Sequence, residues 1–175
     1  MNVTVVPVGF LQCNCYLIEI KNEVLVVDPG DELEKILEKI GNKKVIGIIL
    51  THRHFDHIGC VEELRDRYNV LVYDYTNLRE GKHQLGSFNF EVIYTLGHTM
   101  DSITFYFEEN KFMCTGDFLF YDTIGRCDFE DSDYQEMLKS IEKIKKYPDD
   151  IIISPGHGPL TNLGREKKYN PYFNR

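Results

Sequence analysis

The chain has 175 residues, of which 42% are hydrophobic and 27% are charged. This composition excludes a disordered or fibrous protein, and the length favours one domain, residues 1–175, with a sizeable buried core. The formal net charge of −8 disfavours general binding to nucleic acids, because an acidic surface repels phosphate backbones.

The hydrophobic pattern predicts strands that alternate with helices over much of the chain. Continuous apolar or β-branched runs are typical of strands, and apolar residues at i, i+3, i+4 and i+7 are typical of helices. In chain order we expect strands at 3–8, 16–20 and 24–27, a helix at 31–40, a strand at 45–50, a helix at 57–68, strands at 70–73, 88–94, 103–107 and 111–115, a helix at 134–147 and a strand at 151–153. Ser132 and Gln135 predict a capping box at the start of the third helix.

Two of these strands, 24–27 and 45–50, are apolar without alternation. Such runs are expected of strands that are covered on both faces. Because helices lie between several of the strands, the pattern predicts an α/β layered domain in which outer helices cover the sheets.

Neither a membrane segment nor a secretory leader is indicated by the sequence. Apolar runs stay well below the roughly 18 residues that a membrane-spanning helix needs. The first residues, MNVTVVPVGF, lack the basic and apolar regions of a signal peptide, so we expect a cytoplasmic protein. The five cysteines include no Cys-x-x-Cys pair, and we expect reduced, mostly buried thiols.

Three of the six histidines crowd into the segment THRHFDH at residues 51–57. In an extended stretch His52 and His54 point to the same face, because side chains alternate along a strand. The chain then turns into a helix, so Asp56 and His57 project at a new angle. Four ligand-type groups can therefore aim at two nearby points, which is the spacing expected of a dinuclear metal site.

The other ligand-type residues follow strand ends. His98, Asp117 and His157 each come shortly after a predicted strand, through a glycine-bearing turn. Strand ends on one edge of a sheet cluster in space, and α/β proteins place their sites at this edge. We therefore expect these three residues to join the histidine segment, whereas we expect His83 to lie in a solvated loop.

Ligand chemistry narrows the choice of metal. Imidazole nitrogens together with carboxylates suit zinc, iron, manganese or cobalt, and no thiolate is needed. An Asp can bridge two cations because each of its oxygens can serve one metal, and Asp117 is the candidate for that position.

Six motifs occur in order along nearly the whole chain. They are VVDPG at 26–30, THRHFDH at 51–57, LGHT at 96–99, TGDFLF at 115–120, IGRCDF at 124–129 and SPGHGPLT at 154–161. With these motifs the chain resembles the metallo-β-lactamase superfamily, and in particular its single-domain, glyoxalase II-like (hydroxyacylglutathione hydrolase-like) members. The resemblance implies an α/β fold, a four-layer αβ/βα sandwich with the site along one edge of two central sheets.

The resemblance also implies two groups of metal ligands joined by one bridging carboxylate. The implied ligands are His52, His54 and His98 for one metal, Asp56, His57 and His157 for the other, and Asp117 as the bridge. Asp28 would steady the histidine segment, as metal-bound imidazoles commonly require, and a turn-forming Asp-Pro-Gly is a compatible alternative. Two zinc ions per chain are implied, with iron or manganese as alternatives.

The implied activity is hydrolysis of thioesters, in which a hydroxide between two cations attacks the carbonyl carbon and a thiolate leaves. Asp56 and Asp117 would be the catalytic carboxylates. The alternatives are a persulfide dioxygenase-like oxygenase that uses one iron, and a metallohydrolase of another ester or a lactone. The expected partner is a small-molecule thioester, not a nucleic acid or a membrane, and the oligomeric state is left open.

Substrate contacts are expected to be few. Two-domain glyoxalase II enzymes carry a C-terminal helical domain that binds glutathione, and we expect no such domain here. Arg126 lies in a loop that borders the substrate in the family, and an ion pair with Asp128 or Asp131 is the alternative. The basic segment 165–175 could supply carboxylate-binding charge, or it could be a solvated tail.

Overall fold

Two β-sheets form the centre of the structure, a computed structural model that describes residues 1–174. The first sheet contains, in spatial order, β1 (Asn2–Val8), β2 (Cys13–Ile20), β3 (Glu23–Val27), β4 (Lys44–Ile49) and β5 (Val72–Tyr73). The second contains β13 (Thr161–Asn162), β12 (Ile152–Pro155), β9 (Phe112–Gly116), β8 (Ile103–Phe107), β7 (Phe88–Tyr94) and β6 (Gly81–Leu85). A short hairpin consists of β10 (Leu119–Phe120) and β11 (Thr123–Ile124).

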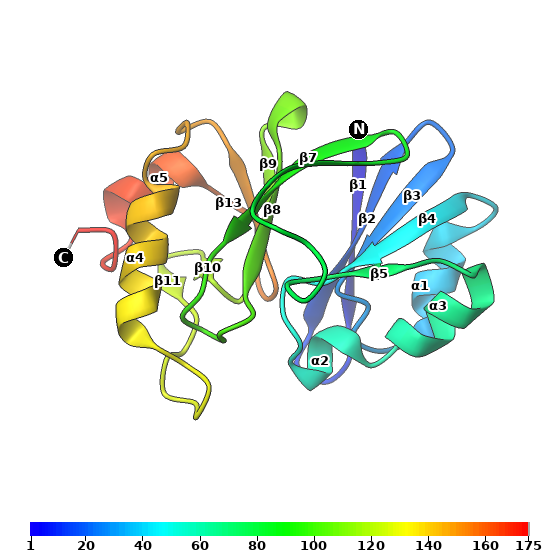
Figure 1. The fold of residues 1–175 in the computed structure, drawn as a ribbon, viewed down its shortest axis with the longest axis horizontal. Coiled ribbons are helices and arrows are strands. Elements are labelled where there is room, and N and C mark those ends of the chain that lie inside the picture. Colours follow the sequence, from blue (N-terminus) through cyan, green and yellow to red (C-terminus); the bar gives the residue numbers. More distant parts are fainter. Residues whose placement is uncertain (175) are drawn as a thin grey trace.

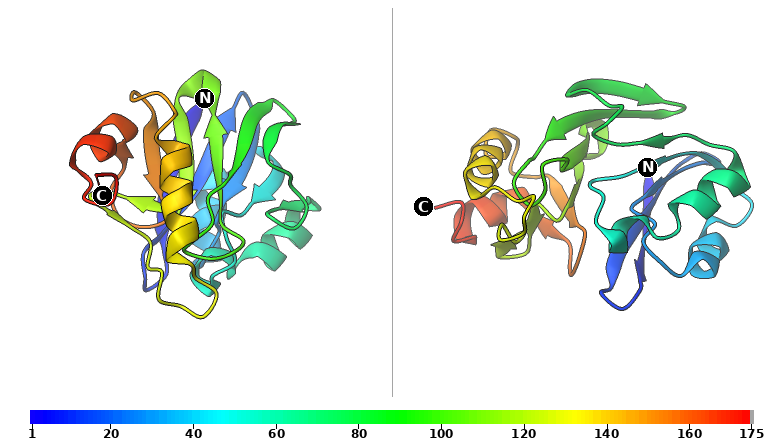
Figure 2. Two further views of the ribbon diagram at one scale, coloured as in Figure 1. Left: turned by 60° about the vertical axis from the view of Figure 1, so that its left-hand side comes forward. Right: turned by 60° about the horizontal axis from the view of Figure 1, so that its bottom comes forward.

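Helices cover the outer face of each sheet, so the molecule has four layers (Figures 1 and 2). Helices α1 (Leu33–Ile40) and α3 (Val61–Tyr68) lie against the first sheet, and α4 (Tyr134–Ile144) and α5 (Leu163–Tyr169) lie on the side of the second. The short α2 (Phe55–Ile58) lies at one edge of the sheets, and a single 3-10 turn, η1 (Glu108–Asn110), joins β8 to β9. The predicted four-layer α/β sandwich is confirmed.

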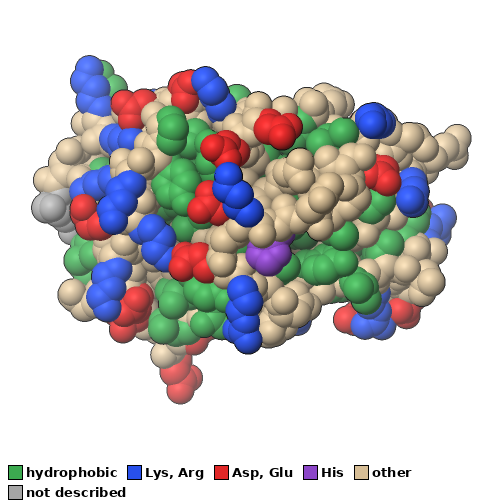
Figure 3. Space-filling view, turned by 45° about the horizontal axis from the view of Figure 1, so that its top comes forward, with side chains coloured by type: hydrophobic (Ala, Val, Ile, Leu, Met, Phe, Trp, Pro, Cys, Tyr) green, Lys and Arg blue, Asp and Glu red, His purple; other side chains and the backbone are tan. Residues whose placement is uncertain are grey.

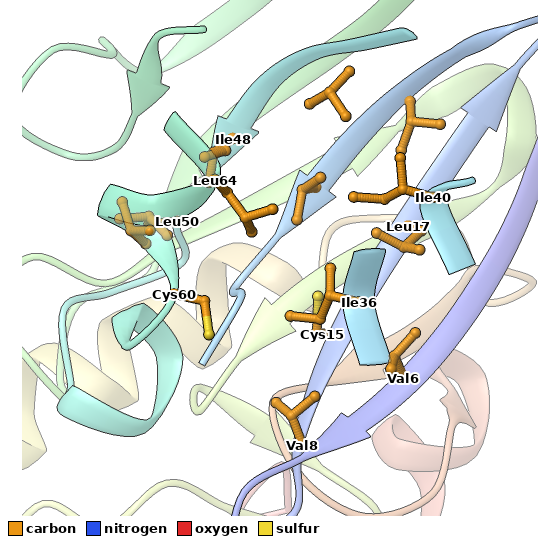
Figure 4. Packing of buried hydrophobic residues seen from close by; sticks show 14 of the residues in the cluster. Val6, Val8, Cys15, Leu17, Ile36, Ile40, Ile48, Leu50, Cys60 and Leu64 are labelled. Carbon is orange, nitrogen blue, oxygen red and sulfur yellow. The ribbon is translucent and has the colours of Figure 1, made fainter. Parts of the chain in front are cut away.

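Strand β3 shows why residues 24–27 are apolar without alternation. Val24 and Val26 belong to the buried cluster between the first sheet and its helices, whereas Leu25 and Val27 belong to the cluster between the two sheets. Both faces of this strand are therefore removed from water, as the sequence predicts. In the first cluster the α1 side chains Ile36 and Ile40 point toward the sheet (Figure 4).

Helix α4 covers the second sheet but begins differently from the prediction. The side chain of Asp133, not that of Ser132, caps the helix, and its Oδ1 accepts hydrogen bonds from the backbone N–H groups of Gln135 and Glu136 at 2.7 and 3.1 Å. The Ser132 hydroxyl instead donates to the carbonyl oxygen of His98 at 2.8 Å. Either residue type can cap a helix, and here Asp133 does so while the Ser132 hydroxyl is engaged by the loop that carries His98.

Two further segments differ from the predictions. The predicted helix 57–68 is divided into α2 and α3, because the backbone N–H of Cys60 donates to Pro29 at 2.9 Å and interrupts the helical ladder. His83 does not lie in a loop: it lies on β6 opposite Phe90, its ring stacks on that phenyl ring at 5.9 Å, and it is half-buried. Alternating polar residues hid this edge strand from the sequence pattern.

The two sheets are joined by a seam between the start of β2 and the end of β12. The amide of Asn14 donates to the carbonyl oxygens of Pro155 and Gly158 at 3.1 and 2.9 Å. The Tyr16 hydroxyl also donates to Pro155, at 2.6 Å. Because these groups are buried and paired, the seam fixes the relative position of the two sheets at this edge.

The described surface carries charges of both signs (Figure 3), and the cysteines are unpaired, as the sequence predicts. The upper face of Figure 1, brought forward in Figure 3, carries basic and acidic side chains interspersed with apolar ones. Among residues 1–174 all five cysteines are unpaired, and all but the half-buried Cys127 are buried. In the same range no helix has the length and apolar character needed to cross a bilayer.

Candidate metal centre

Strand direction brings the predicted ligands to one edge of the molecule. Strands β3 and β4 run parallel, as do β9 and β12, and β7 has the same direction as β9 because both pair antiparallel with β8. Their carboxyl ends therefore share an edge, where α2 also lies (Figure 1). The segments that leave this edge carry Asp28, His52, His54, Asp56, His57, His98, Asp117 and His157.

A first group consists of three imidazoles and one carboxylate. Nδ1 of His54 lies 3.1 Å from Nε2 of His52 and 3.0 Å from Nε2 of His98. Oδ2 of Asp117 lies 3.5 Å from the same nitrogen of His98. One ligand atom from each of the four residues lies within 4.8 Å of the others, so the group could hold a metal ion. The prediction that His52 and His54 share a face agrees with this geometry.

Hydrogen bonds on the far side of the rings set which nitrogen faces the site. Nδ1 of His98 donates to the carbonyl oxygen of Arg126 at 2.8 Å. The Thr51 hydroxyl donates to Asp28 at 2.6 Å, so it must accept from Nδ1 of His52 at 3.1 Å. In both neutral imidazoles the lone pair is therefore on Nε2, the atom that points toward the other ligands.

A second group consists of Asp56, His57 and His157. Oδ2 of Asp56 lies 3.2 Å from Nε2 of His157 and 3.9 Å from Nε2 of His57. Nδ1 of His157 donates to the carbonyl oxygen of Leu11 at 3.0 Å, which again turns Nε2 toward the site. These three residues could hold a second ion.

Asp117 lies between the two groups. Its Oδ1 is 3.4 Å from Nε2 of His57, and its Oδ2 is 3.5 Å from Nε2 of His98 and 3.6 Å from Nε2 of His157. The carboxylate thus offers oxygens to both groups. This is the position that a bridging ligand requires.

Asp28 is hydrogen-bonded to one ligand of the second group and, through Thr51, to one ligand of the first, which agrees with the steadying role expected for it. Its carboxylate accepts hydrogen bonds from the backbone N–H of Thr51 at 2.8 Å, from the Thr51 hydroxyl at 2.6 Å and from Nδ1 of His57 at 3.0 Å. Asp28 is buried and adopts a positive φ of 49°, a conformation that Asp tolerates better than most residues. One buried carboxylate therefore orients His57 directly and His52 through Thr51.

Two buried polar atoms in the site have no hydrogen-bond partner. They are Nε2 of His57 and Oδ1 of Asp117, which face each other across 3.4 Å. Leaving such atoms unpaired in a protein interior is costly, so their presence indicates a missing partner. Because the missing partner must accept electron pairs from nitrogen and oxygen, the donor set fits a zinc, iron or manganese ion.

The pKa values of the ligand side chains also favour the binding of a cation. Burial lowers the pKa of His52 well below 6.5 and also lowers the pKa of His98, so both rings are neutral at pH 7. Burial opposes ionisation of Asp117 and His57, but the attraction between the two groups, which lie 3.4 Å apart, holds the pKa of Asp117 at about 2 and raises that of His57 well above 6.5. The ionised carboxylate of Asp117 thus favours a positive charge beside it, which is what a bound cation would supply.

Glycine at position 156 makes room for the ligands. A Cβ built there would overlap with Oδ1 of Asp117 and lie 2.7 Å from Cε1 of His57. The turn SPGHG therefore needs this glycine because a ligand carboxylate approaches its backbone closely.

A cavity of about 590 Å³ opens above both groups. It is lined by the ligands His54, Asp56, His98, Asp117 and His157, by Arg126, and by apolar side chains. The Arg126 guanidinium forms a bidentate ion pair with Asp128, with N–O distances of 2.9 Å, and lies 4.6 Å above the ring of Phe129. The ion pair given as an alternative is therefore present, and any contribution of Arg126 to substrate binding remains a proposal.

The apolar wall of the cavity was not identified from the sequence. Its members are Leu11, Phe55, Phe120, Ile124 and Phe129. The available signal was that Phe120 and Phe129 stand at the ends of the TGDFLF and IGRCDF motifs, close to ligand positions. A motif shows that an aromatic residue is present, but not which way its ring points.

Of the basic segment 165–175, the described residues 165–174 fold against the domain and do not form a solvated tail, and Arg175 lies outside the described residues. Arg165 lies on α5 and pairs with Asp122 at 2.6 Å, and Lys167 pairs with Asp149 at 2.6 Å. Glu166 is completely buried and accepts hydrogen bonds from the backbone N–H of Asp122 and from the Thr161 hydroxyl. Arg165 and Glu166 thus hold the β10–β11 hairpin, Lys167 holds the loop before β12, and none of the three lines the cavity.

Comparison with known proteins agrees with the fold. A family model for the metallo-beta-lactamase superfamily matches residues 8–82 and 73–157. Hydroxyacylglutathione hydrolase GloC of Haemophilus influenzae is 34% identical over an alignment that covers 99% of each chain.

Three solved structures share the fold over most of both chains. The BLEG-1 B3 metallo-beta-lactamase is 30% identical, with a TM-score of 0.95 over 99% of this chain and 100% of that one. TTHA1623, in a di-iron-bound form, is 32% identical, with a TM-score of 0.89 over 97% and 100%. ETHE1 from Myxococcus xanthus is 26% identical, with a TM-score of 0.92 over 100% and 86%.

Proposed function

The chain belongs to the metallo-beta-lactamase superfamily, and on this basis we propose that it is a dinuclear metal-dependent hydrolase of thioesters. The observation that carries the proposal is the position of Asp117, whose two oxygens face two separate ligand groups on the floor of an open cavity. The similarity to a hydroxyacylglutathione hydrolase along the whole chain favours a thioester over other esters.

We propose that the two groups hold two divalent cations. One cation would bind His52, His54 and His98, and the other would bind Asp56, His57 and His157, with Asp117 serving both. Bound there, the cations would lower the pKa of a water molecule and polarise a carbonyl group. Zinc suits the nitrogen and oxygen donors, and the di-iron form of TTHA1623 keeps iron as an alternative.

The protein groups around the cations position the reactants. Oδ2 of Asp56 lies at the cavity floor and can accept a hydrogen bond from the attacking water, which orients its oxygen toward the carbonyl carbon. Hydrolysis then forms a C–O bond from the water to the acyl carbon, passes the two protons of that water to solvent and breaks the C–S bond, which leaves a carboxylate and a thiolate. A thiolate is a good leaving group and takes up a proton from solvent, so no further acid is required near the sulfur.

A mono-iron oxygenase is the second candidate, and the structural similarity to ETHE1 favours it. ETHE1 from Myxococcus xanthus shares the fold at 26% identity over the whole of this chain. Such an enzyme needs one metal, whereas the described chain also brings Asp56, His57 and His157 into ligand geometry. The complete second group therefore favours the dinuclear hydrolase.

The test combines metal analysis with a turnover assay. The purified chain should bind two ions, measured by elemental analysis, and the loaded protein should release free thiol from thioesters. Asp56→Asn should remove the second ion and most of the turnover, whereas the same change on the exposed α3 residue Asp66 should alter neither. A protein that binds one iron and consumes oxygen with a persulfide, but releases no thiol, would show that the second candidate is right.

A further inference from the structure

The wall of the cavity above the ligands is apolar and is built from four separate segments. Leu11 comes from the β1–β2 turn, Phe55 from α2, Phe120 and Ile124 from the β10–β11 hairpin, and Phe129 from the loop before α4. A cavity floored by metal ligands and walled by such side chains suits a ligand with a polar head and an apolar body.

Two phenyl rings of this wall stand against the ligand imidazoles. The ring of Phe129 lies 5.4 Å from that of His54 and 5.7 Å from that of His98, edge to face in both cases. The ring of Phe120 lies 6.4 Å from that of His157. The apolar surface therefore begins at the ligands themselves, so a group bonded directly to the reacting carbonyl would already touch it.

A second hollow, of about 230 Å³, continues the apolar surface away from the ligands. It shares Leu11, Phe55 and Asp56 with the main cavity and adds Val8 and Phe10. The side chains of Phe10 and Phe55 are 99% and 76% exposed, so water covers them in the free protein. A chain of methylene groups that lies along Leu11 and Phe55 would be removed from water, and it would also cover part of the exposed apolar surface of the protein.

The charge of the cavity disfavours an anionic substrate body. Among the described residues that line it, Arg126 is the one Lys or Arg, and its guanidinium is already bound by Asp128 and stacked on Phe129. The second hollow adds a carboxylate, Asp31, and no base. Away from the ligand groups, where the body of the substrate would lie, the two carboxylates of glutathione would thus find little cationic protein surface in either hollow, whereas an uncharged chain needs none.

From these features we propose that the preferred substrates are thioesters of apolar, medium-length acyl chains, with the chain running over Leu11 and Phe55 toward Phe10. The proposal rests on the thioester hydrolase function proposed above and specifies its acyl group.

The expected size of the effect follows from the burial of methylene groups. Full burial of one CH₂ favours binding about fourfold, and a groove open on one side gives roughly half of that. Octanoyl and butyryl thioesters differ by four methylene groups, so their kcat/KM values should differ by roughly 16- to 250-fold. A small polar acyl group should resemble butyryl.

The experiment measures kcat/KM of the zinc-loaded protein for butyryl, hexanoyl and octanoyl thioesters of N-acetylcysteamine, an uncharged thiol. In the double variant Leu11→Gln, Phe55→Gln the octanoyl-to-butyryl ratio should fall at least tenfold; the ratio is the readout, because a general loss of activity lowers both kcat/KM values together and leaves it unchanged. The matched control is Leu71→Gln, which makes the same change at a residue that is 68% exposed and lies before β5, away from the cavity. It should keep the wild-type ratio.

A binding measurement separates this proposal from the proposed function. The thioethers S-octyl- and S-butyl-N-acetylcysteamine cannot be hydrolysed, and calorimetry should show that the octyl compound binds more tightly by the same ratio. If thioesters are hydrolysed with a ratio below about three, or if the double variant keeps the full ratio, the acyl-chain proposal is overturned and the hydrolase stands. If no thioester is turned over but the octyl thioether binds selectively, the groove is supported and the hydrolase is not.

Discussion

Replacing Asp28 with Asn tests whether one buried carboxylate sets the state of the second ligand group. The carboxylate accepts from the Thr51 hydroxyl and from Nδ1 of His57 with the same oxygen, Oδ2. An amide oxygen at that position would turn the amide nitrogen onto the backbone N–H of Thr51, a donor that is fixed in place. With the amide nitrogen at that position instead, the Thr51 hydroxyl can turn, and His57 moves its proton to Nε2, the atom that would bind the metal. Losing a hydrogen bond to a charged acceptor costs about 1.5–3 kcal/mol, which corresponds to a roughly 10- to 150-fold loss of affinity at the second group.

The assay is zinc competition against a chromophoric chelator, which resolves two binding constants, together with ¹⁵N NMR of the His57 ring to locate its proton. The zinc affinity of the second ligand group should fall roughly 10- to 150-fold, and that of the first group should change far less. Asp66→Asn, which is the same chemical change on an exposed residue of α3, should leave both constants unaltered. Unweakened zinc binding in Asp28→Asn, with the His57 proton still on Nδ1, would refute the reasoning.

Three further predictions concern the bridge, the turn and the stability. Asp117→Ala should weaken both metals and abolish the zinc-induced rise in Tm, which thermal melts with and without zinc will show; an unchanged rise would contradict the bridging position. Gly156→Ala should lower stability by about 1–3 kcal/mol and reduce metal content, checked by urea unfolding and elemental analysis, because the added methyl group meets the Asp117 carboxylate. Burial alone raises the pKa of Asp74, but hydrogen bonds from Thr76 and pairing with Arg53 lower it below 3.8. Asp74 therefore stabilises the fold above its unfolded pKa, so Asp74→Asn should cost stability at pH 7, with a difference that shrinks toward about pH 3 in urea unfolding.

The parts of the fold that could be predicted from the sequence are those that depend on periodicity. Residues 24–27 are apolar at every position, and both faces of β3 are indeed buried. The alternation of side chains likewise predicts that His52 and His54 share a face, and the 3.1 Å separation of their ring nitrogens agrees. Both inferences require only local geometry and the rule that strand ends gather on one edge.

The parts that could not be predicted depend on contacts between distant segments. His83 is flanked by polar residues, so nothing local marks the edge strand that pairs it with Phe90. Glu166 reads as part of a basic, solvated segment, but it is buried because it accepts hydrogen bonds from Asp122 and Thr161. The apolar wall escaped notice for the same reason, since its members come from four segments that meet only in the folded chain.

The seam between β2 and β12 constrains when the metal centre can be completed during synthesis. It joins residues that are 141 and 144 positions apart, and the second ligand group likewise waits for His157, about 100 residues after His57. At translation rates of about 5–20 residues per second, the histidine segment exists for roughly 5–20 s before its last partner is made. Contacts of such long sequence separation also form late in folding. The second ligand group is therefore completed only by the turn after β12, near the end of the chain, so a nascent chain that stops before residue 157 can offer a full ligand set to one ion but not to two.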